Sequence, residues 1–160
     1  MNPAIPSVAE HAAAPDVAEA LEGLIHVMKR VYRRGLAAQG VDLSPYEIHA
    51  LLFAGRESGA GLHQLAQDSG RDKAQVTRTT KALEHKGLLS RERDPADLRC
   101  CRLVLTRRGR ELYDIIREVR AGIDVRLFAD LDAAEQKKLS ELLERCRLGL
   151  EHARGGNVPA

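Results

Sequence analysis

Aromatic residues are almost absent from this chain of 160 residues, which has three tyrosines, two phenylalanines and no tryptophan. A ligand pocket in this protein therefore has few rings on which a ligand could stack. Long apolar runs are lacking too, since no stretch approaches the roughly 20 apolar residues needed to cross a bilayer. Residues 1–6 also lack the basic and then apolar pattern of a signal peptide, so we expect a cytoplasmic protein with no membrane partner.

Cysteine and the common catalytic motifs are scarce as well. Three cysteines, an odd number in a chain expected inside the cell, argue against a structural disulfide framework. The six histidines lack a tight metal-binding spacing such as HxxxH. A glycine-rich phosphate loop, a nucleophile elbow and a catalytic acid pair are missing too. We therefore expect no enzyme activity, no cofactor and no metal site.

Positive charge is concentrated in one part of the chain, although the net charge is only +2. Residues 71–110 contain 12 Lys and Arg against 5 Asp and Glu, which leaves 13 basic and 18 acidic residues for the rest. Any single lysine can simply belong to a solvated face. Segregation on this scale favours a polyanionic partner.

The same region predicts two helices joined by a tight turn. The first helix has a small apolar face at Leu62, Leu65 and Ala66 and ends at Ser69-Gly70. Asp72 is expected to cap the second helix, which then begins near Lys73.

The second helix has two different faces at a rotation of about 100° per residue. One arc carries Val76, Thr80, Leu83 and Gly87, and the opposite arc carries Ala74, Arg78, Lys81 and His85, with Gln75 and Thr77 on its flanks. One side is suited to packing and the other is polar and cationic. This arrangement is typical of a helix that enters a DNA major groove.

Two short strands follow, separated by a turn-rich loop at residues 94–99. Leu89, Arg91 and Arg93 share one face of the first strand, and Cys101, Leu103 and Leu105 share one face of the second. Such a ribbon can lie along the DNA backbone and direct an arginine toward a narrow minor groove. The predicted fold is therefore mainly α, a winged helix-turn-helix with a small two- or three-stranded antiparallel wing.

Longer amphipathic helices are expected on both sides of this unit. Asp16 is the expected cap of the first helix, which should stop near Gly40. A second helix should begin at Ser44-Pro45, with Ile48, Leu51 and Leu52 as its core face. A loop at residues 55–61 should follow it. After Thr106 a long helix should run to about residue 127, and Asp132 should cap a last helix. We expect a mobile arm at residues 1–15 and a single domain at 16–160, with the winged helix at about 43–106 and dimerisation helices at about 16–39 and 107–154.

These flanking helices carry more apolar surface than a small winged helix can cover, which favours a homodimer. A twofold dimer would present two recognition helices to a pseudo-palindromic site in double-stranded DNA, about one helical turn apart. The alternative is a monomer whose helices fold back on each other.

Residues 72–78 and 83–91 resemble the recognition helix and first wing strand of MarR-type repressors. Residues 94–99 and 105–109 look like that family's wing loop and its exit into the next helix, and residues 43–47 look like the entry to its second helix. The resemblance covers about residues 17–154 and implies a winged-helix DNA-binding regulator. The sequence departs from the family pattern at Cys100-Cys101, where a small and an apolar residue are more usual.

Residues expected to contact DNA lie on the second helix and on the wing. Arg78 can form two hydrogen bonds with guanine and Gln75 with adenine, while the methyl groups of Ala74 and Thr77 can contact thymine. Lys73, Lys81 and His85 suit phosphates. The set is completed on the wing by Arg91, Arg93, Asp97 and Arg99; by resemblance Arg99 lies at the wing tip and Asp97 holds the loop. The alternative for each residue is a solvated side chain.

The resemblance also implies a small aromatic or phenolic effector, bound in a crevice between the dimer helices and the winged helix. The candidate ligand-binding residues are His26, Arg30, Tyr46 and His49; the alternative is that they are ordinary packing and surface residues. Cys100 should lie near Arg99 and Arg102, whose charges favour the thiolate, so that a redox role for Cys100 or Cys101 is conceivable. The simpler alternative makes Cys101 a small core residue beside Leu103 and Leu105, and Cys146 a packing residue.

The predicted function is a sequence-specific, homodimeric transcription factor, most simply a repressor released by a ligand or by cysteine oxidation. An effector that favours one separation of the two lobes would shift the dimer away from the spacing of the grooves. One alternative is a sequence-indifferent architectural DNA-binding protein. Another is a dimer that has lost DNA binding, against which the presence of Arg78, Lys81 and Arg99 argues.

Overall fold

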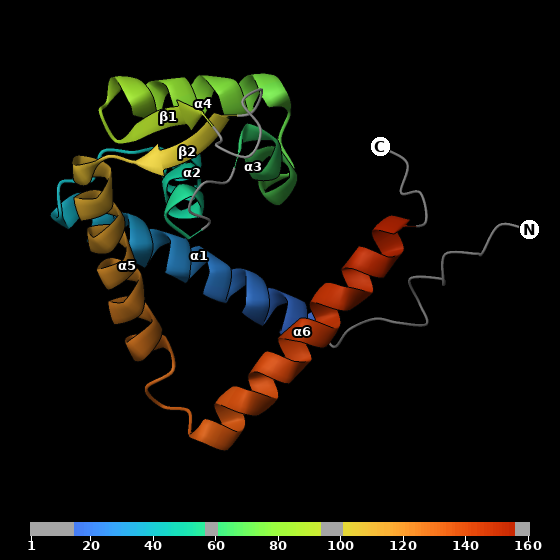
Figure 1. Cartoon of the computed structure of the whole chain (residues 1–160). Coiled ribbons are helices and arrows are strands. Elements are labelled where there is room, and N and C mark those ends of the chain that lie inside the picture. The colour runs from blue at the N-terminus through green and yellow to red at the C-terminus, as the bar shows by residue number, and fades with distance from the viewer. Residues whose placement is uncertain (1–14, 57–60, 94–100, 156–160) are drawn as a thin grey trace, which may run out of the picture. The chain divides into compact units, whose positions relative to one another are not determined.

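The computed structural model of the chain describes residues 15–56, 61–93 and 101–155 (Figure 1). Its elements in chain order are α1 (Pro15–Ala38), α2 (Pro45–Arg56), α3 (Leu62–Ser69), α4 (Lys73–His85), β1 (Leu89–Arg93), β2 (Cys101–Leu105), α5 (Arg107–Leu127) and α6 (Ala133–Gly155). The predicted fold class, mainly helical with a small antiparallel wing, is confirmed. The chain forms two compact units, Met1–Arg120 and Ala121–Ala160. Of the arm expected at residues 1–15, all but Pro15 lies outside the described residues.

The helix α2 forms the centre of the first unit. Ala50 and Leu51 have no exposed surface, and Phe53 and Ala54 have almost none. The core around them is built from every other element of the unit, through Leu36, Leu65, Val76, Leu83, Leu89, Leu103 and Ile116. The predicted core face at Ile48, Leu51 and Leu52 is therefore only part of the buried surface, because α3, α4 and β2 all pack against α2.

Local signals determine where most helices begin and end. At the start of α2, Ser44 Oγ accepts a hydrogen bond from the Glu47 amide at 3.2 Å, and Glu47 Oε2 accepts one from the Ser44 amide at 2.8 Å. This reciprocal pair is a capping box, and Pro45 occupies the first helical position as expected. The expected cap at Asp16 is wrong, because α1 already begins at Pro15. The expected stop at Gly40 is confirmed by its left-handed backbone, with φ of 68°.

Glycines allow α5 to lie close to its neighbours. A Cβ atom at Gly109 in α5 would run into the carbonyl oxygen of Leu88, and one at Gly55 would run into the ring of Tyr113. Gly55 was expected in a loop, but α2 continues to Arg56 and packs this last turn against Tyr113. The expected loop is therefore shorter, and residues 57–60 lie outside the described residues.

The wing is a two-stranded antiparallel sheet. Its register pairs Leu89 with Leu105, Arg91 with Leu103, and Arg93 with Cys101. A single additional bridge joins Gly61 to Arg102, so the segment before α3 touches the edge of the wing. The buried residues Leu89 and Leu103 join the wing to the core, and the strands become exposed toward Arg93 and Cys101.

The second unit contains the end of α5 and all of α6. The expected cap is confirmed, since Asp132 Oδ1 accepts hydrogen bonds from the amides of Ala134 at 2.7 Å and Glu135 at 2.9 Å. Along the described part of α6 no side chain is buried within the single chain. None of the helices in the described residues is both long enough and apolar enough to span a membrane.

Candidate nucleic-acid interface

The helix α4 packs with one side and exposes the other, as the sequence predicted. Val76, Thr80 and Leu83 have no exposed surface. Asp72 caps the helix, because its Oδ1 accepts a hydrogen bond from the Gln75 amide at 2.8 Å. Before this cap, Gly70 adopts a left-handed backbone with φ of 62°, which produces the tight turn after α3. The turn and the cap together set which side of α4 faces the core.

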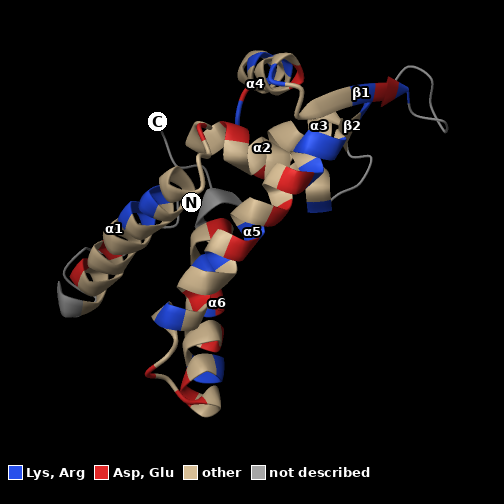
Figure 2. Cartoon of the chain, turned by 90° about the vertical axis from the view of Figure 1, so that its left-hand side faces the viewer, with Lys and Arg blue, Asp and Glu red and all other residues tan. Residues whose placement is uncertain are grey.

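The opposite side of α4 faces solvent and carries positive charge (Figure 2). The exposed residues there are Lys73, Ala74, Arg78, Lys81 and His85, with Gln75 and Thr77 half-buried at the edges. The hydroxyl of Thr77 donates to the carbonyl of Lys73 at 2.7 Å, which leaves its methyl group for contact with a partner. Seven polar or small side chains thus border one accessible helical surface, which has the dimensions to enter a major groove.

Arg91 of the first wing strand, expected to contact DNA, is held within the unit. Its Nε lies 3.0 Å from Oε1 of Glu84, and its Nη2 donates to Oγ1 of Thr80 at 3.1 Å. Because Arg91 has the same parity as the buried Leu89, its side chain leaves the strand on the face that packs against α4. The Arg91 side chain therefore connects the first wing strand to α4.

The far end of the wing is exposed. Arg93 and Cys101 face each other across the strands, and both are exposed. The expectation that Cys101 is a small core residue is wrong, because the buried part of β2 ends at Leu103 and Cys101 lies beyond it. Asp97, Arg99 and Cys100, the remaining wing candidates, lie outside the described residues.

The C-terminal end of α4 is held by residues that sequence reasoning missed. The ammonium group of Lys86 lies 2.8 Å from Oε1 of Glu47 and donates to the carbonyl of Asp42 at 3.3 Å. Burial raises the pKa of Glu47, but hydrogen bonds from Lys86 and Ser44 outweigh it and lower the pKa below its ordinary value. The hydroxyl of Thr106 donates to the carbonyl of Gly87 at 2.6 Å. Glu47 could have been noticed through its capping box, but no local signal pairs it with Lys86.

The four residues expected to bind an effector do not come together. His26 and Arg30 are exposed on α1. Tyr46 and His49 stack on each other and point to the end of α3: the Tyr46 hydroxyl lies 3.2 Å from Ser69 Oγ, and His49 Nε2 lies 2.9 Å from Asp68 Oδ2.

A crevice of about 720 Å³ does lie between α1 and α2. Its polar lining comes from Lys29, Tyr32, Arg33 and Asp42, none of which was expected to bind an effector, beside the apolar Leu36 and Ile48. Burial raises the pKa of Tyr32, partly offset by the charge of Arg120, so the phenol stays neutral and can donate a hydrogen bond. The crevice thus offers cations and a phenol above an apolar floor.

The histidines, cysteines and carboxylates of the described residues do not gather into a metal site. No group of three or more His, Cys, Asp or Glu lies close enough there to hold a metal ion. Cys146, predicted to pack in an apolar stripe, is exposed on α6 in the single chain.

Comparisons with known proteins agree with this geometry. The model of the MarR family matches residues 43–101, from the entry of α2 to the start of β2. The chain is 32% identical over 130 residues to YdgJ of Bacillus subtilis (strain 168), described as an uncharacterized HTH-type transcriptional regulator; the match covers 81% of this chain and 78% of YdgJ.

Solved structures share the fold. A complex of S. aureus MepR with DNA superposes with a TM-score of 0.70 at 21% identity, over 83% of this chain and 95% of the other. CouR from Rhodococcus jostii RHA1, bound to p-coumaroyl-CoA, gives a TM-score of 0.69 at 21% identity, over 82% of this chain and 91% of the other.

Proposed function

This chain belongs to the MarR family of transcriptional regulators, and we propose that it is a sequence-specific DNA-binding repressor. The exposed cationic face of α4 carries the proposal. Arg78 and Lys81 point to solvent there, while the opposite side of the same helix is fully buried. Arg78 contacts a guanine edge and Gln75 an adenine edge, while Lys73 and Lys81 contact phosphates. The DNA in the MepR complex supports this use of the shared fold.

The wing contributes through its exposed end. Arg93 contacts the DNA backbone or the minor groove together with Arg99, and Asp97 holds the wing loop that carries Arg99. Arg91 contributes by orientation instead, because its guanidinium is already bonded to Glu84 and Thr80.

The working form is a homodimer, in which a second copy covers apolar side chains that one chain leaves exposed. On α1 these are Val17, Leu21, Leu24, Ile25 and Val27, and on α6 they are Leu142, Leu143, Leu148 and Leu150. Exposed apolar patches on this scale are unusual in monomers. A twofold dimer also places two copies of α4 on one pseudo-palindromic operator.

A small organic anion or an oxidant releases the repressor. The crevice between α1 and α2 suits an aromatic or phenolic anion, because Lys29 and Arg33 supply charge and Tyr32 a neutral donor and a ring. The ligand of CouR supports effector binding in this fold. Oxidation would act at the exposed Cys101 or at Cys100, beside the cations of the wing.

The test is footprinting on the gene's own upstream region, repeated with a phenolic panel and with peroxide. We expect protection of one pseudo-palindrome that Arg78→Ala weakens, and competition by random duplex that is at least about 1,000-fold weaker. Release by peroxide should be lost in Cys101→Ser, whereas release by a phenolic ligand should be lost in Arg33→Gln. Equal competition by random duplex would indicate an architectural DNA-binding protein instead.

A further inference from the structure

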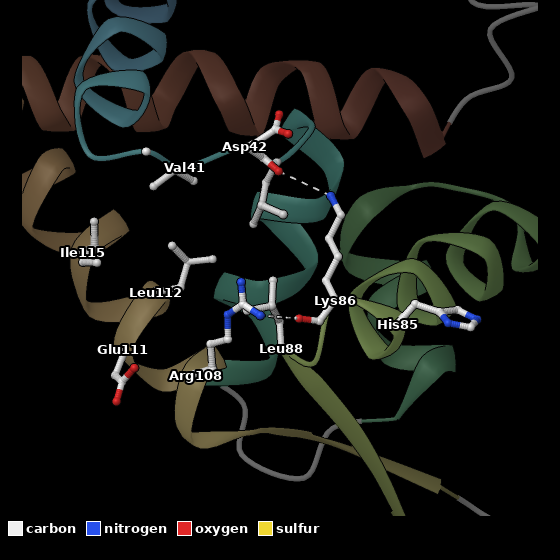
Figure 3. Close-up of a pocket in the computed structure, with 11 residues that line it drawn as sticks. Val41, Asp42, His85, Lys86, Leu88, Arg108, Glu111, Leu112 and Ile115 are labelled. Carbon is white, nitrogen blue, oxygen red and sulfur yellow. Dashed lines mark hydrogen bonds between the residues drawn. The ribbon is translucent and has the colours of Figure 1, made fainter.

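A second cavity, of about 500 Å³, opens at the C-terminal end of the recognition helix (Figure 3). It shares the α1–α2 connection with the crevice, but its other walls come from the end of α4, from the residues that follow it and from the first turns of α5. Its apolar wall is formed by Val41, Leu43, Leu88, Leu112 and Ile115. A volume of this size lies within the range of roughly 300–1,000 Å³ that is typical of small-molecule sites.

Arg108 is the charged residue around this cavity whose side chain is available to bind a ligand. The Arg108 guanidinium points into the hollow in Figure 3, while the carboxylates of Asp42 and Glu111 point away from it. Glu111 lies 3.2 Å from Arg107, and Lys86 is bonded to Glu47. Among the described residues, no carboxylate lies within ion-pair distance of Arg108. A planar guanidinium beside an apolar wall suits a carboxylate, which it can bind through two parallel hydrogen bonds.

We propose that this cavity binds a monocarboxylate with a compact apolar body. The carboxylate is held by Arg108, and the apolar body lies against Leu112, Ile115 and Val41. The site adjoins the crevice and shares residues 41–43 with it, but its cation is Arg108, whereas those of the crevice are Lys29 and Arg33.

The position of Arg108 connects this site to DNA binding, a step that rests on the proposed function. Its Nη1 donates at 3.4 Å to the carbonyl of Lys86, the residue that caps the C-terminal end of α4. A carboxylate on the guanidinium competes with this bond and loosens the end of the recognition helix. The monocarboxylate therefore lowers DNA affinity, and DNA lowers the affinity for the monocarboxylate by the same factor.

The experiment titrates the full-length, isotope-labelled chain with hexanoate and cyclohexanecarboxylate and follows amide resonances. Hexanamide and cyclohexanecarboxamide are matched neutral probes. We expect the carboxylates to shift resonances of residues 41–43, 86–88 and 108–115, and the amides to bind about tenfold more weakly or worse.

Arg108→Gln should weaken carboxylate binding by about tenfold or more. Two control variants should change it less than about twofold: Arg107→Gln, because the Arg107 side chain is 95% exposed, and the crevice variant Arg33→Gln. Leu112→Gln tests the apolar wall independently and should also weaken binding.

The proposal is overturned by an equal loss in Arg108→Gln and Arg107→Gln, or by equal binding of acids and amides. It is also overturned if the shifts are confined to residues 29–48, which line the crevice, and spare 86–88 and 108–115. A parallel measurement of DNA binding without any carboxylate separates the two hypotheses. If DNA binding is absent but the carboxylate still needs Arg108, the proposed function fails and this site stands. If DNA binds and hexanoate does not, only the site fails.

Discussion

Nε of Arg91 lies 3.0 Å from Oε1 of Glu84, so the first wing strand is tied by an ion pair to the recognition helix. The two side chains are only 25% and 30% exposed. The same guanidinium donates to Thr80, whose hydroxyl in turn donates to the Val76 carbonyl at 3.0 Å. The orientation of the wing relative to α4 therefore depends on a half-buried polar network rather than on apolar packing alone.

Removing Arg91 should reduce stability as well as DNA binding. Arg91→Ala removes the cation beside the half-buried Glu84 and the hydrogen bond that the Thr80 oxygen accepts, and we expect a loss of about 1–2 kcal/mol in the free energy of unfolding. Denaturant unfolding followed by circular dichroism measures it. Arg93→Ala, at the exposed end of the same strand, is the control and should leave stability within about 0.5 kcal/mol. Equal stability of the two variants would show that the Arg91 network contributes nothing.

Arg78 and Lys81 should differ in what they contribute to DNA binding. Arg78→Ala should cost about 1–3 kcal/mol on the operator and relax the preference at one base pair, because a two-bond base contact is lost. Lys81→Ala should weaken operator and random duplex alike and reduce the salt dependence by about one counterion. Fluorescence anisotropy over a series of salt concentrations, with single-base operator variants, distinguishes the two. A uniform loss in Arg78→Ala would argue against base contact.

The pair of Glu47 and Lys86 should make stability depend on acid pH. Because the pKa of Glu47 is lowered in the folded protein, the unfolded chain takes up this proton first as the pH falls below the ordinary value of 4.5. The stabilisation is thus present above that pH and is lost as the pH falls through the folded pKa. Glu47→Gln keeps the capping box but removes the charge, so we expect a flatter stability profile between about pH 5 and pH 3.

The control for this profile is Glu111→Gln, which removes a carboxylate that is 61% exposed and paired with Arg107. Its effect on stability at neutral pH should stay below about 1 kcal/mol. A Glu47→Gln profile that runs parallel to the wild-type profile would rule out Glu47 as a source of the acid dependence.

The apolar side of α6 should be required for assembly. Leu143 is 47% exposed in the single chain, and Leu143→Glu would place a charge in the proposed dimer interface. We expect light scattering to report half the mass of the wild type, together with a loss of operator binding of about 100-fold or more, because two half-sites are no longer bound together. Arg145→Glu, about 160° around the same helix from Leu143, is the control and should disturb the dimer less than Leu143→Glu. A dimer that survives Leu143→Glu would move the interface away from this helix.

The parts of this fold that depend on neighbouring residues were predictable from the sequence. The cap at Asp72, the capping box of Ser44 and Glu47, and the separation of α4 into a buried and an exposed side all arise within one or two turns of helix. The family pattern at residues 43–101 has the same local origin.

The parts that the sequence could not predict join elements far apart in the chain. Parity alone placed Arg91 on the same side as Leu89, but only the packing of β1 against α4 decided that this side meets Glu84 and not DNA. Likewise, Cys101 is exposed because the core ends at Leu103. Periodicity assigns a residue to a face of its own helix or strand, whereas the partner of that face is decided by how the elements pack. For that reason the pairing of Lys86 with Glu47, and the cavity around Arg108, become visible only in the folded chain.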